Sequence, residues 1–137
     1  MARATWEMPE DFMEKVSRLA DQTDVIVPKV LEAGGKVVLE TVRSHLHSVL
    51  SGDSTGELER SLGLSPVRLD RNGNPDIKVG FSEPRSDGGS NAKLANILEH
   101  GKHGQPPRPF LKPAKIASRG PATEAMVAKL EEEIGKI

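Results

Sequence analysis

The chain has 137 residues, a length that suits one domain and allows a hydrophobic core to form. It contains no cysteine, which excludes disulfide bonds, thiolate metal sites and a thiol nucleophile. The net charge is −1, and neither a signal peptide nor an apolar run long enough to span a membrane is expected from the sequence. We therefore predict one domain over residues 1–137, with a helical half over 9–62 and a hairpin, a loop and a C-terminal helix over 63–137.

Two helical patterns fill the first part of the chain. Pro9 can open a helix because its missing N–H would be unpaired there, and apolar spacing predicts this helix over residues 9–22. Asp24 is a favourable N-cap for a second and longer helix over residues 24–50. Pro28 is tolerated only if it lies in the first turn of that second helix.

Glycines then punctuate the pattern. The pair Gly34-Gly35 weakens the second helix and predicts either a kink or close packing against a neighbour. Gly52 is expected to end this helix. Ser54 and Glu57 have the spacing of a capping box, with Ser54 as the cap, which predicts a short third helix after them.

The middle of the chain has the pattern of a β-hairpin. Residues 70–75 form a strong turn cluster, and residues 77–81 alternate between apolar and other side chains. Pro66 indicates that the first strand is an edge strand or starts late, because proline cannot donate to a ladder. The next residues, 83–91, have the composition of a flexible loop.

The last part of the chain is predicted to be mainly helical. Residues 92–100 could form a helix or a strand, and their spacing favours a helix. Residues 102–109 are rich in proline and predict an extended loop. A helix is expected over 111–117, an interruption at Gly120-Pro121, and a further helix after Pro121.

The charges are not evenly spread along the sequence. Residues 1–59 carry 6 basic and 11 acidic groups, a net −5, and residues 120–137 carry 2 basic and 4 acidic groups, a net −2. Residues 60–119 carry 11 basic and 5 acidic groups, a net +6. The middle segment could face a polyanion or an acidic partner, or its charges could be scattered over a loop-rich surface.

The four histidines do not have the arrangement of a zinc site. His45 and His47 lie about 200° apart around the predicted helix, so they cannot easily share one ion. His100 and His103 could approach each other, but a site needs three or four ligands. We expect no metal and no cofactor.

The sequence patterns that could indicate catalysis are as weak as the pattern for a zinc site. Ser54 follows Gly52-Asp53, but the local context is that of a helix end and offers no base to activate a serine. Residues 87–90 are rich in glycine without the lysine of a phosphate loop, and the acidic run 131–133 is expected to be solvated. A different possibility is that Phe110 and the basic residues around it bind nucleic acid: Arg108, Lys112, Lys115 and Arg119.

Three motifs stand in a fixed order along the chain. They are Thr-Gly-x-Leu-x-x-Ser at residues 55–61, Ala-x-x-x-Glu-His-Gly at 95–101, and Pro-Phe-Leu-Lys-Pro-Ala at 109–114. With the N-terminal helices, the hairpin and the C-terminal helix, this order resembles the tail-component, or tail-completion (neck), family of long-tailed phages, the Hong Kong 97-like group. The resemblance covers roughly residues 10–135. The chain departs from the family where His100 replaces an aromatic residue and where Gly120-Pro121 is expected to break a continuous helix.

The resemblance implies an α+β fold, with a small antiparallel sheet packed against a long N-terminal helix, or helix pair, and a C-terminal helix. It implies a structural protein of the virion, not an enzyme, that completes the tail or joins it to the head at the neck. Its partners would be other neck and tail proteins, further copies of itself in a ring, and nearby packaged DNA, without a membrane. During assembly the protein would be in the host cytoplasm.

The loop between the second and third motifs is the expected working surface. The alternative function is a small nucleic-acid-binding module that uses residues 60–119. No catalytic residue is assigned. The residues proposed for contacts with neighbouring subunits are Glu99, His100, Gly101, Arg108, Pro109, Phe110 and Lys112.

Overall fold

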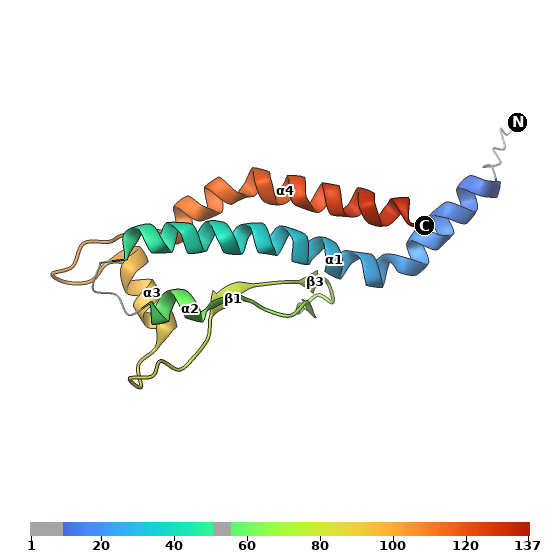
Figure 1. Cartoon of the computed structure of the whole chain (residues 1–137). Coiled ribbons are helices and arrows are strands. Elements are labelled where there is room, and N and C mark those ends of the chain that lie inside the picture. Colours follow the sequence, from blue (N-terminus) through green and yellow to red (C-terminus); the bar gives the residue numbers. More distant parts are fainter. Residues whose placement is uncertain (1–9, 51–55) are drawn as a thin grey trace, which may run out of the picture.

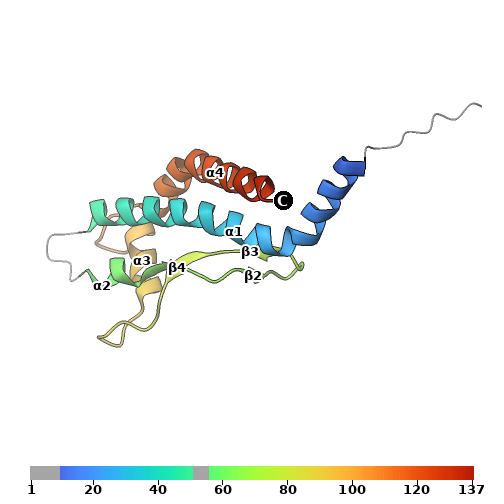
Figure 2. The same ribbon diagram turned by 45° about the vertical axis from the view of Figure 1, so that its right-hand side comes forward.

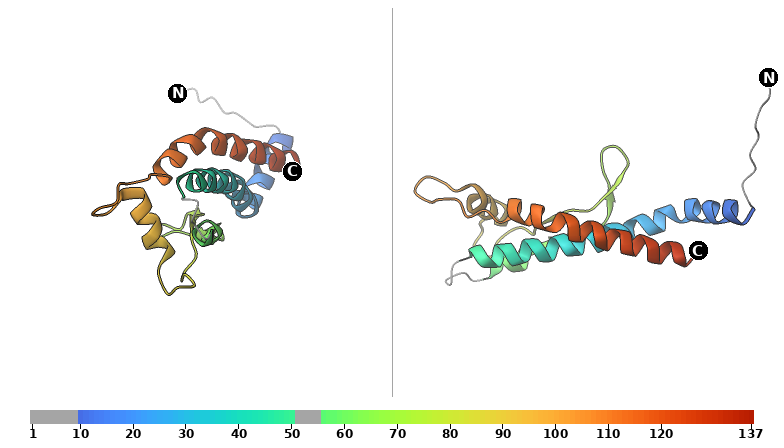
Figure 3. Two further views of the ribbon diagram at one scale, coloured as in Figure 1. Left: turned by 60° about the vertical axis from the view of Figure 1, so that its left-hand side comes forward. Right: turned by 90° about the horizontal axis from the view of Figure 1, so that it is seen from above.

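A computed structural model of the chain describes residues 10–50 and 56–137 (Figure 1). Its elements are α1 (Glu10–Val49), α2 (Glu57–Ser61), β1 (Leu62–Leu64), β2 (Arg68–Leu69), β3 (Pro75–Asp76), β4 (Val79–Phe81), α3 (Asn91–His100) and α4 (Leu111–Gly135). α1 runs through the middle, α4 lies along one side of it in the opposite direction, and the strands with α2 and α3 lie on its other side (Figures 1 and 3). The predicted α+β fold is confirmed.

α1 is one continuous helix of 40 residues, so the predicted break between residues 22 and 24 is wrong. No glycine or proline stands at that point, and the Thr23 hydroxyl donates to the Leu19 carbonyl one turn back at 3.0 Å. Asp24 is therefore an interior residue and not an N-cap. Pro28 also lies inside α1 and removes one helical hydrogen bond, which is a cause of bending. The first part of α1 is set at an angle to the rest (Figure 2).

α1 ends at Val49, and Gly56 occupies the N-cap position of α2. Gly52 and Ser54, which were predicted to end one helix and cap the next, lie outside the described residues. The short helix itself is confirmed. Glu57 is its first residue, and the capping box predicted between Ser54 and Glu57 rests on a residue outside the described ranges.

Gly34 and Gly35 allow α1 to be approached closely from two sides. A Cβ on Gly34 would lie 2.6 Å from the Sδ of Met126 in α4, and one on Gly35 would lie 2.9 Å from the Cδ1 of Leu64 in β1. Of the two predicted explanations for this pair, close packing is confirmed. Because α4 and the hairpin both reach the backbone of α1 here, α1 forms the middle layer of the fold.

We expect Gly34→Leu to lower the free energy of unfolding by about 1–2 kcal/mol. Overpacking between α1 and α4 should cost about 2–3 kcal/mol, of which the gain in helix propensity offsets roughly 1 kcal/mol. Urea unfolding measures the change, and Met126→Ala is the matched partner because it makes room for the new side chain. The double variant should lose less than the two single variants together. Additive losses would show that Gly34 does not set the spacing of the two helices.

The predicted hairpin is confirmed, but it consists of two short antiparallel ladders. Between them Pro66 and Val67 lie opposite a single residue, Ile77, as in a β-bulge. The ladder stops at Pro66 because proline has no N–H to donate. The registers of the two ladders are Leu62 with Phe81, Gly63 with Gly80, Leu64 with Val79, Arg68 with Asp76, and Leu69 with Pro75.

The core lies where α1, α2, β1, α3 and the start of α4 meet. Its side chains are mainly aliphatic, as expected for a chain with so few aromatic residues. Leu46 and Phe110 have no exposed surface at all. The buried cluster is made of Val42, Leu46, Leu58, Leu62, Ala95, Leu98, Phe110 and Ala114.

α4 is also continuous, so the predicted interruption at Gly120-Pro121 is wrong. Pro121 lies on the exposed side of the helix, where water can bond the carbonyl group that its missing N–H leaves unpaired. Near the far end of α4, the buried Glu133 carboxylate pairs with Lys29 of α1 at 3.3 Å. Contacts with α1 therefore hold both halves of α4 in one helix.

Candidate functional site: the joint between α3 and α4

The start of α3 is held by a dense set of hydrogen bonds, and residues 92–100 are helical as their spacing favoured. Ser90 is the N-cap of this helix. The Glu83 carboxylate accepts hydrogen bonds from the N–H groups of Asn91 and Ala92 at 3.1 and 2.6 Å, and from the Ser90 hydroxyl at 3.0 Å. These bonds, that of the Ala92 N–H above all, hold the pKa of Glu83 below its ordinary value.

Gly101 ends α3 in a conformation that other residues rarely adopt. Its φ is 75°, and a Cβ at this position would lie 2.8 Å from both the Gln105 carbonyl oxygen and the Pro107 nitrogen. A tight turn follows, and the chain returns so that the Arg108 N–H donates to the Leu98 carbonyl at 2.6 Å. A side chain at residue 101 would therefore push the returning segment away from α3.

Glu99 accepts hydrogen bonds from the whole N-terminus of α4. Its Oε2 accepts from the N–H groups of Phe110 and Leu111, each at 2.8 Å, and its Oε1 from the Lys112 N–H at 3.0 Å. The next residue, Pro113, has no N–H. One carboxylate and one proline thus account for all four N–H positions that a helix start leaves unpaired. This is a physical reason for the glutamate of the second motif and the second proline of the third to occur together.

The pKa of Glu99 lies below its ordinary value. Partial burial disfavours the charged form, but the hydrogen bonds from Leu111, Phe110 and Lys112 outweigh that effect, and His100 adds a Coulombic attraction. We call the segment that connects α3 to α4, from Glu99 to Lys112, the joint. At neutral pH the joint therefore holds a negative charge at the positive end of the α4 dipole, where an anion is favoured.

Phe110 connects the joint to the core. Its ring is fully buried and meets the ring of Phe81 edge to face, with 6.3 Å between the centroids and 78° between the planes. It belongs to the same buried cluster as Leu46 of α1. Phe110 therefore packs within its own chain and fixes the end of the loop against α1 and the hairpin.

The outward side of the joint is polar and basic. Residues 100–102 and 104–107 line a shallow hollow of about 480 Å³. Arg108 also reaches the C-terminal end of α1, where its Nη1 donates to the Val49 carbonyl at 3.4 Å and a cation is favoured. Of the seven residues proposed for intermolecular contacts, four are exposed, namely His100, Arg108, Pro109 and Lys112. The other three hold the loop from within, namely Glu99, Gly101 and Phe110.

A second network, which the sequence analysis did not find, fixes the loop before α3. The buried Asn91 side chain accepts from Arg85 at 2.9 Å and donates to the Ser82 carbonyl at 2.7 Å. Arg85 pairs with Glu57 of α2 at 3.6 Å, and Glu57 accepts from the Ser86 N–H at 2.6 Å. The loop predicted over residues 83–91 is thus tied to α2 and α3. Glu57 and Ser86 are 29 positions apart, so no local spacing could indicate this contact.

The first pair of histidines makes local contacts. His45 Nδ1 lies 2.9 Å from the Thr41 carbonyl oxygen within α1, and His47 lies 3.1 Å from Glu59. Ser54 lies outside the described residues. Within residues 10–50 and 56–137, no group of three or more His, Asp or Glu side chains could hold a metal ion. In the same part of the chain, no helix has the length and apolar character needed to cross a membrane.

One family model matches this chain, over residues 10–101. Its family, HK97-gp10-like, is described as "Bacteriophage HK97-gp10, putative tail-component". The match covers α1, the hairpin and α3 as far as Gly101, and so includes the first two of the three motifs. The family resemblance seen in the sequence is thereby confirmed over these residues. No curated protein and no solved structure matches the chain.

Proposed function

The chain belongs to the HK97-gp10-like family of bacteriophage tail components, and from this we propose that it completes the tail or joins it to the head at the phage neck. Family membership indicates a structural role in particle assembly and not catalysis. The position at the neck and the surface used there are our proposal. In this proposal the protein acts by binding to its neighbours in the particle.

The observation that supports this function best is the way in which the joint is held. A loop that has to be ordered on binding lowers affinity, because the lost conformational freedom costs free energy. Here Gly101 fixes the exit from α3, Glu99 fixes the start of α4, and Phe110 fixes both to the core. The exposed residues of the loop are thus presented in a set geometry, as a surface for contact with neighbouring subunits.

The proposed partners are other neck and tail proteins and further copies of this chain. We infer a ring in the virion that surrounds or adjoins the DNA channel, assembled in the host cytoplasm. We further infer that the chain acts as one domain, since α1 contacts both α4 and the hairpin.

Electron microscopy of particles made from a phage genome without this gene tests the proposal. We expect heads and tails that fail to join, or tails without a completed end. Supplying the wild-type protein should restore whole particles. Normal virions in its absence would contradict the neck assignment.

The joint is tested in the same assay with charge-reversed variants. Arg108→Glu combined with Lys112→Glu should restore far fewer joined particles than wild type, because the outward face of the joint is reversed in charge. Arg71→Glu with Lys78→Glu makes the same change on exposed residues of the hairpin and is the control. Equal loss in both variants would show that the joint has no special part in assembly.

A second candidate function is non-specific DNA binding, supported by the exposed cluster Lys112, Lys115 and Arg119 at the start of α4. Lysine and arginine contacts to phosphates release counterions, so affinity should fall steeply as salt concentration rises. A filter-binding titration at several salt concentrations measures the slope. Absence of binding at low salt would remove this candidate and leave the assembly role untouched.

A further inference from the structure

α4 packs one face against α1. That face includes the small buried residues Ala114, Ser118 and Ala122 and, near its far end, the buried Glu133 that pairs with Lys29. Elsewhere on the helix a second series recurs at alternating steps of four and three residues, the spacing by which helices pair side by side. We call this series the outer seam; it consists of Ile116, Gly120, Thr123, Val127, Leu130 and Ile134.

The outer seam is open to solvent along its whole length. Ile116 is 71% exposed, Val127 49%, Leu130 39% and Ile134 42%. A Cβ built on Gly120 would meet nothing within 4 Å. Single exposed apolar residues are ordinary, but a continuous row on one helix face marks a surface for interaction.

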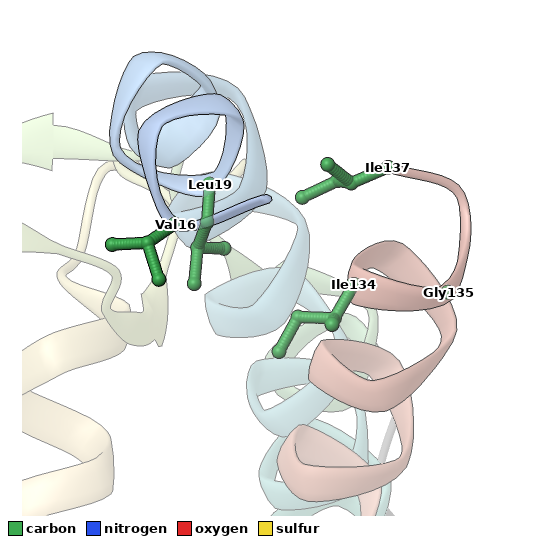
Figure 4. Close-up of a pocket in the computed structure, with 5 residues that line it drawn as sticks. All are labelled: Val16, Leu19, Ile134, Gly135 and Ile137. Carbon is green, nitrogen blue, oxygen red and sulfur yellow. The ribbon is translucent and has the colours of Figure 1, made fainter. Parts of the chain in front are cut away.

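At one end the outer seam opens into an apolar notch between α4 and the first part of α1. The notch has a volume of about 360 Å³, enough for an apolar side chain of a partner. Figure 4 shows Ile134 and Ile137 at the end of α4 reaching toward α1, which carries Val16 and Leu19 on the other side of the gap. The seam and the notch thus form one apolar surface.

The charges beside this surface change sign along α4. Residues 111–120 carry three basic groups and no acidic group, a net +3, whereas residues 121–137 carry two basic and four acidic groups, a net −2. The α1 segment near the notch, residues 10–24, carries two basic and five acidic groups, a net −3. The seam therefore runs from a basic half to an acidic end.

We propose that a second copy of this chain covers the outer seam, with the two α4 helices packed antiparallel about a two-fold axis. This arrangement places the basic half of each helix beside the acidic end of the other, so the attraction occurs twice. A parallel pair would place like charges together. Because the charges of α4 match those of a second α4 that runs in the opposite direction, we identify the partner as a second copy of this chain.

Side-chain size fits the same register. When Ile116 lies opposite Ile134 of the partner copy, Gly120 falls opposite Leu130 and Thr123 opposite Val127. Leu130, the longest side chain in the middle of the seam, then faces Gly120, which has no side chain. Ile116 lies over the notch of the partner. This inference goes beyond the proposed function, because it concerns the free chain in solution.

Cysteine cross-linking tests the orientation of the two helices. Because the chain has no natural cysteine, each introduced cysteine can form a disulfide only with another introduced cysteine. Ile116→Cys and Ile134→Cys are prepared separately, mixed and oxidised. We expect the mixture to form a disulfide-linked dimer with one chain of each kind, and each variant alone to cross-link far less. Lys78→Cys, exposed on the hairpin, is the control that should not cross-link with either. Cross-linking of each variant with itself and not with the other would overturn the antiparallel arrangement.

Sedimentation equilibrium tests the association itself. Wild type should sediment as a dimer that weakens with rising salt, because part of the attraction is between exposed charges. Leu130→Glu should raise the dissociation constant more than about tenfold. Leu69→Glu makes the same change at an exposed leucine of the hairpin and should leave the dimer intact. Circular dichroism confirms that both variants fold.

The outcomes separate this inference from the proposed function. A wild-type chain that is monomeric at every concentration and salt condition would overturn the dimer, whatever the particles look like. Normal virions made without the gene would contradict the neck assignment but would not affect the sedimentation result.

Discussion

Replacing Phe110 with alanine is expected to lower the free energy of unfolding by about 3–5 kcal/mol. The ring has no exposed surface and packs edge to face on Phe81, so its removal leaves a cavity in the core cluster. The same cavity lies under the start of α4. The loss of packing and the loosening of the joint therefore both lower the free energy of unfolding. Urea unfolding followed by circular dichroism measures the change.

Leu69→Ala is the matched control for this prediction. Leu69 lies on the hairpin and is 71% exposed, so its truncation should change stability by no more than about 0.5 kcal/mol. If Phe110→Ala unfolded at the same urea concentration as wild type, the ring would not be part of the core. Restored stability in Phe110→Leu would show that buried volume is the main contribution.

The second large effect is expected at Glu99. Glu99→Ala removes the acceptor for three backbone N–H groups at the start of α4, and should cost about 2–3 kcal/mol of stability at neutral pH. Glu99→Gln keeps the shape but loses the charge, and should cost roughly half as much. Asn96→Ala, an exposed position on the same helix, is the control.

The pH dependence of this effect has a definite sign. The pKa of Glu99 is lower in the folded protein than in the unfolded chain, so the carboxylate stabilises the fold at every pH above its unfolded pKa. That contribution is lost as the pH falls through the lowered folded pKa. The difference in stability between wild type and Glu99→Gln should therefore be constant near neutral pH and shrink in acid. A difference that persisted unchanged in strong acid would mean that ionisation of Glu99 is not its source.

The parts of the fold that could be predicted are those encoded within a few residues. The turn cluster at 70–75 between two strands, the helical spacing of 92–100 and the stop at Gly101 are local signals, and the structure has each of them. Phe110 was expected to contact nucleic acid or neighbouring subunits, whereas the structure buries its ring within the chain.

The continuity of α1 and α4 could not be predicted, because contacts between them override the local signals. A proline inside an isolated helix costs about 3 kcal/mol or more. In α1 the buried Ile26 stands two positions before Pro28, and in α4 the buried Ser118 and Ala122 stand on either side of Gly120. Burial of these residues keeps the turns near each proline helical. The local sequence indicates the free-energy cost of a proline inside a helix, but it does not indicate the tertiary packing that offsets this cost.

For the candidate site, the sequence indicated the residues but not their roles. Glu99 was identified by its motif, yet its bonds to residues 110–112 depend on the reversal of the chain after Gly101, which spacing does not show. The network around Asn91 was missed for the same reason. The outer seam could have been recognised from its alternating steps of four and three residues. It was missed because the predicted break at Gly120-Pro121 divided it between two helices.

The pairing of α1 with α4 has a consequence for how the chain folds during synthesis. Lys29 and Glu133, which pair across the two helices, are 104 positions apart in the sequence. At about 5–20 residues per second, a ribosome needs roughly 3–12 s to pass from the end of α1 to the start of α4. For that interval the buried face of α1 around Ile26 has no partner on the α4 side. The nascent helix is then open to chaperones and to other nascent copies, and translation speed becomes a factor in the yield of folded protein.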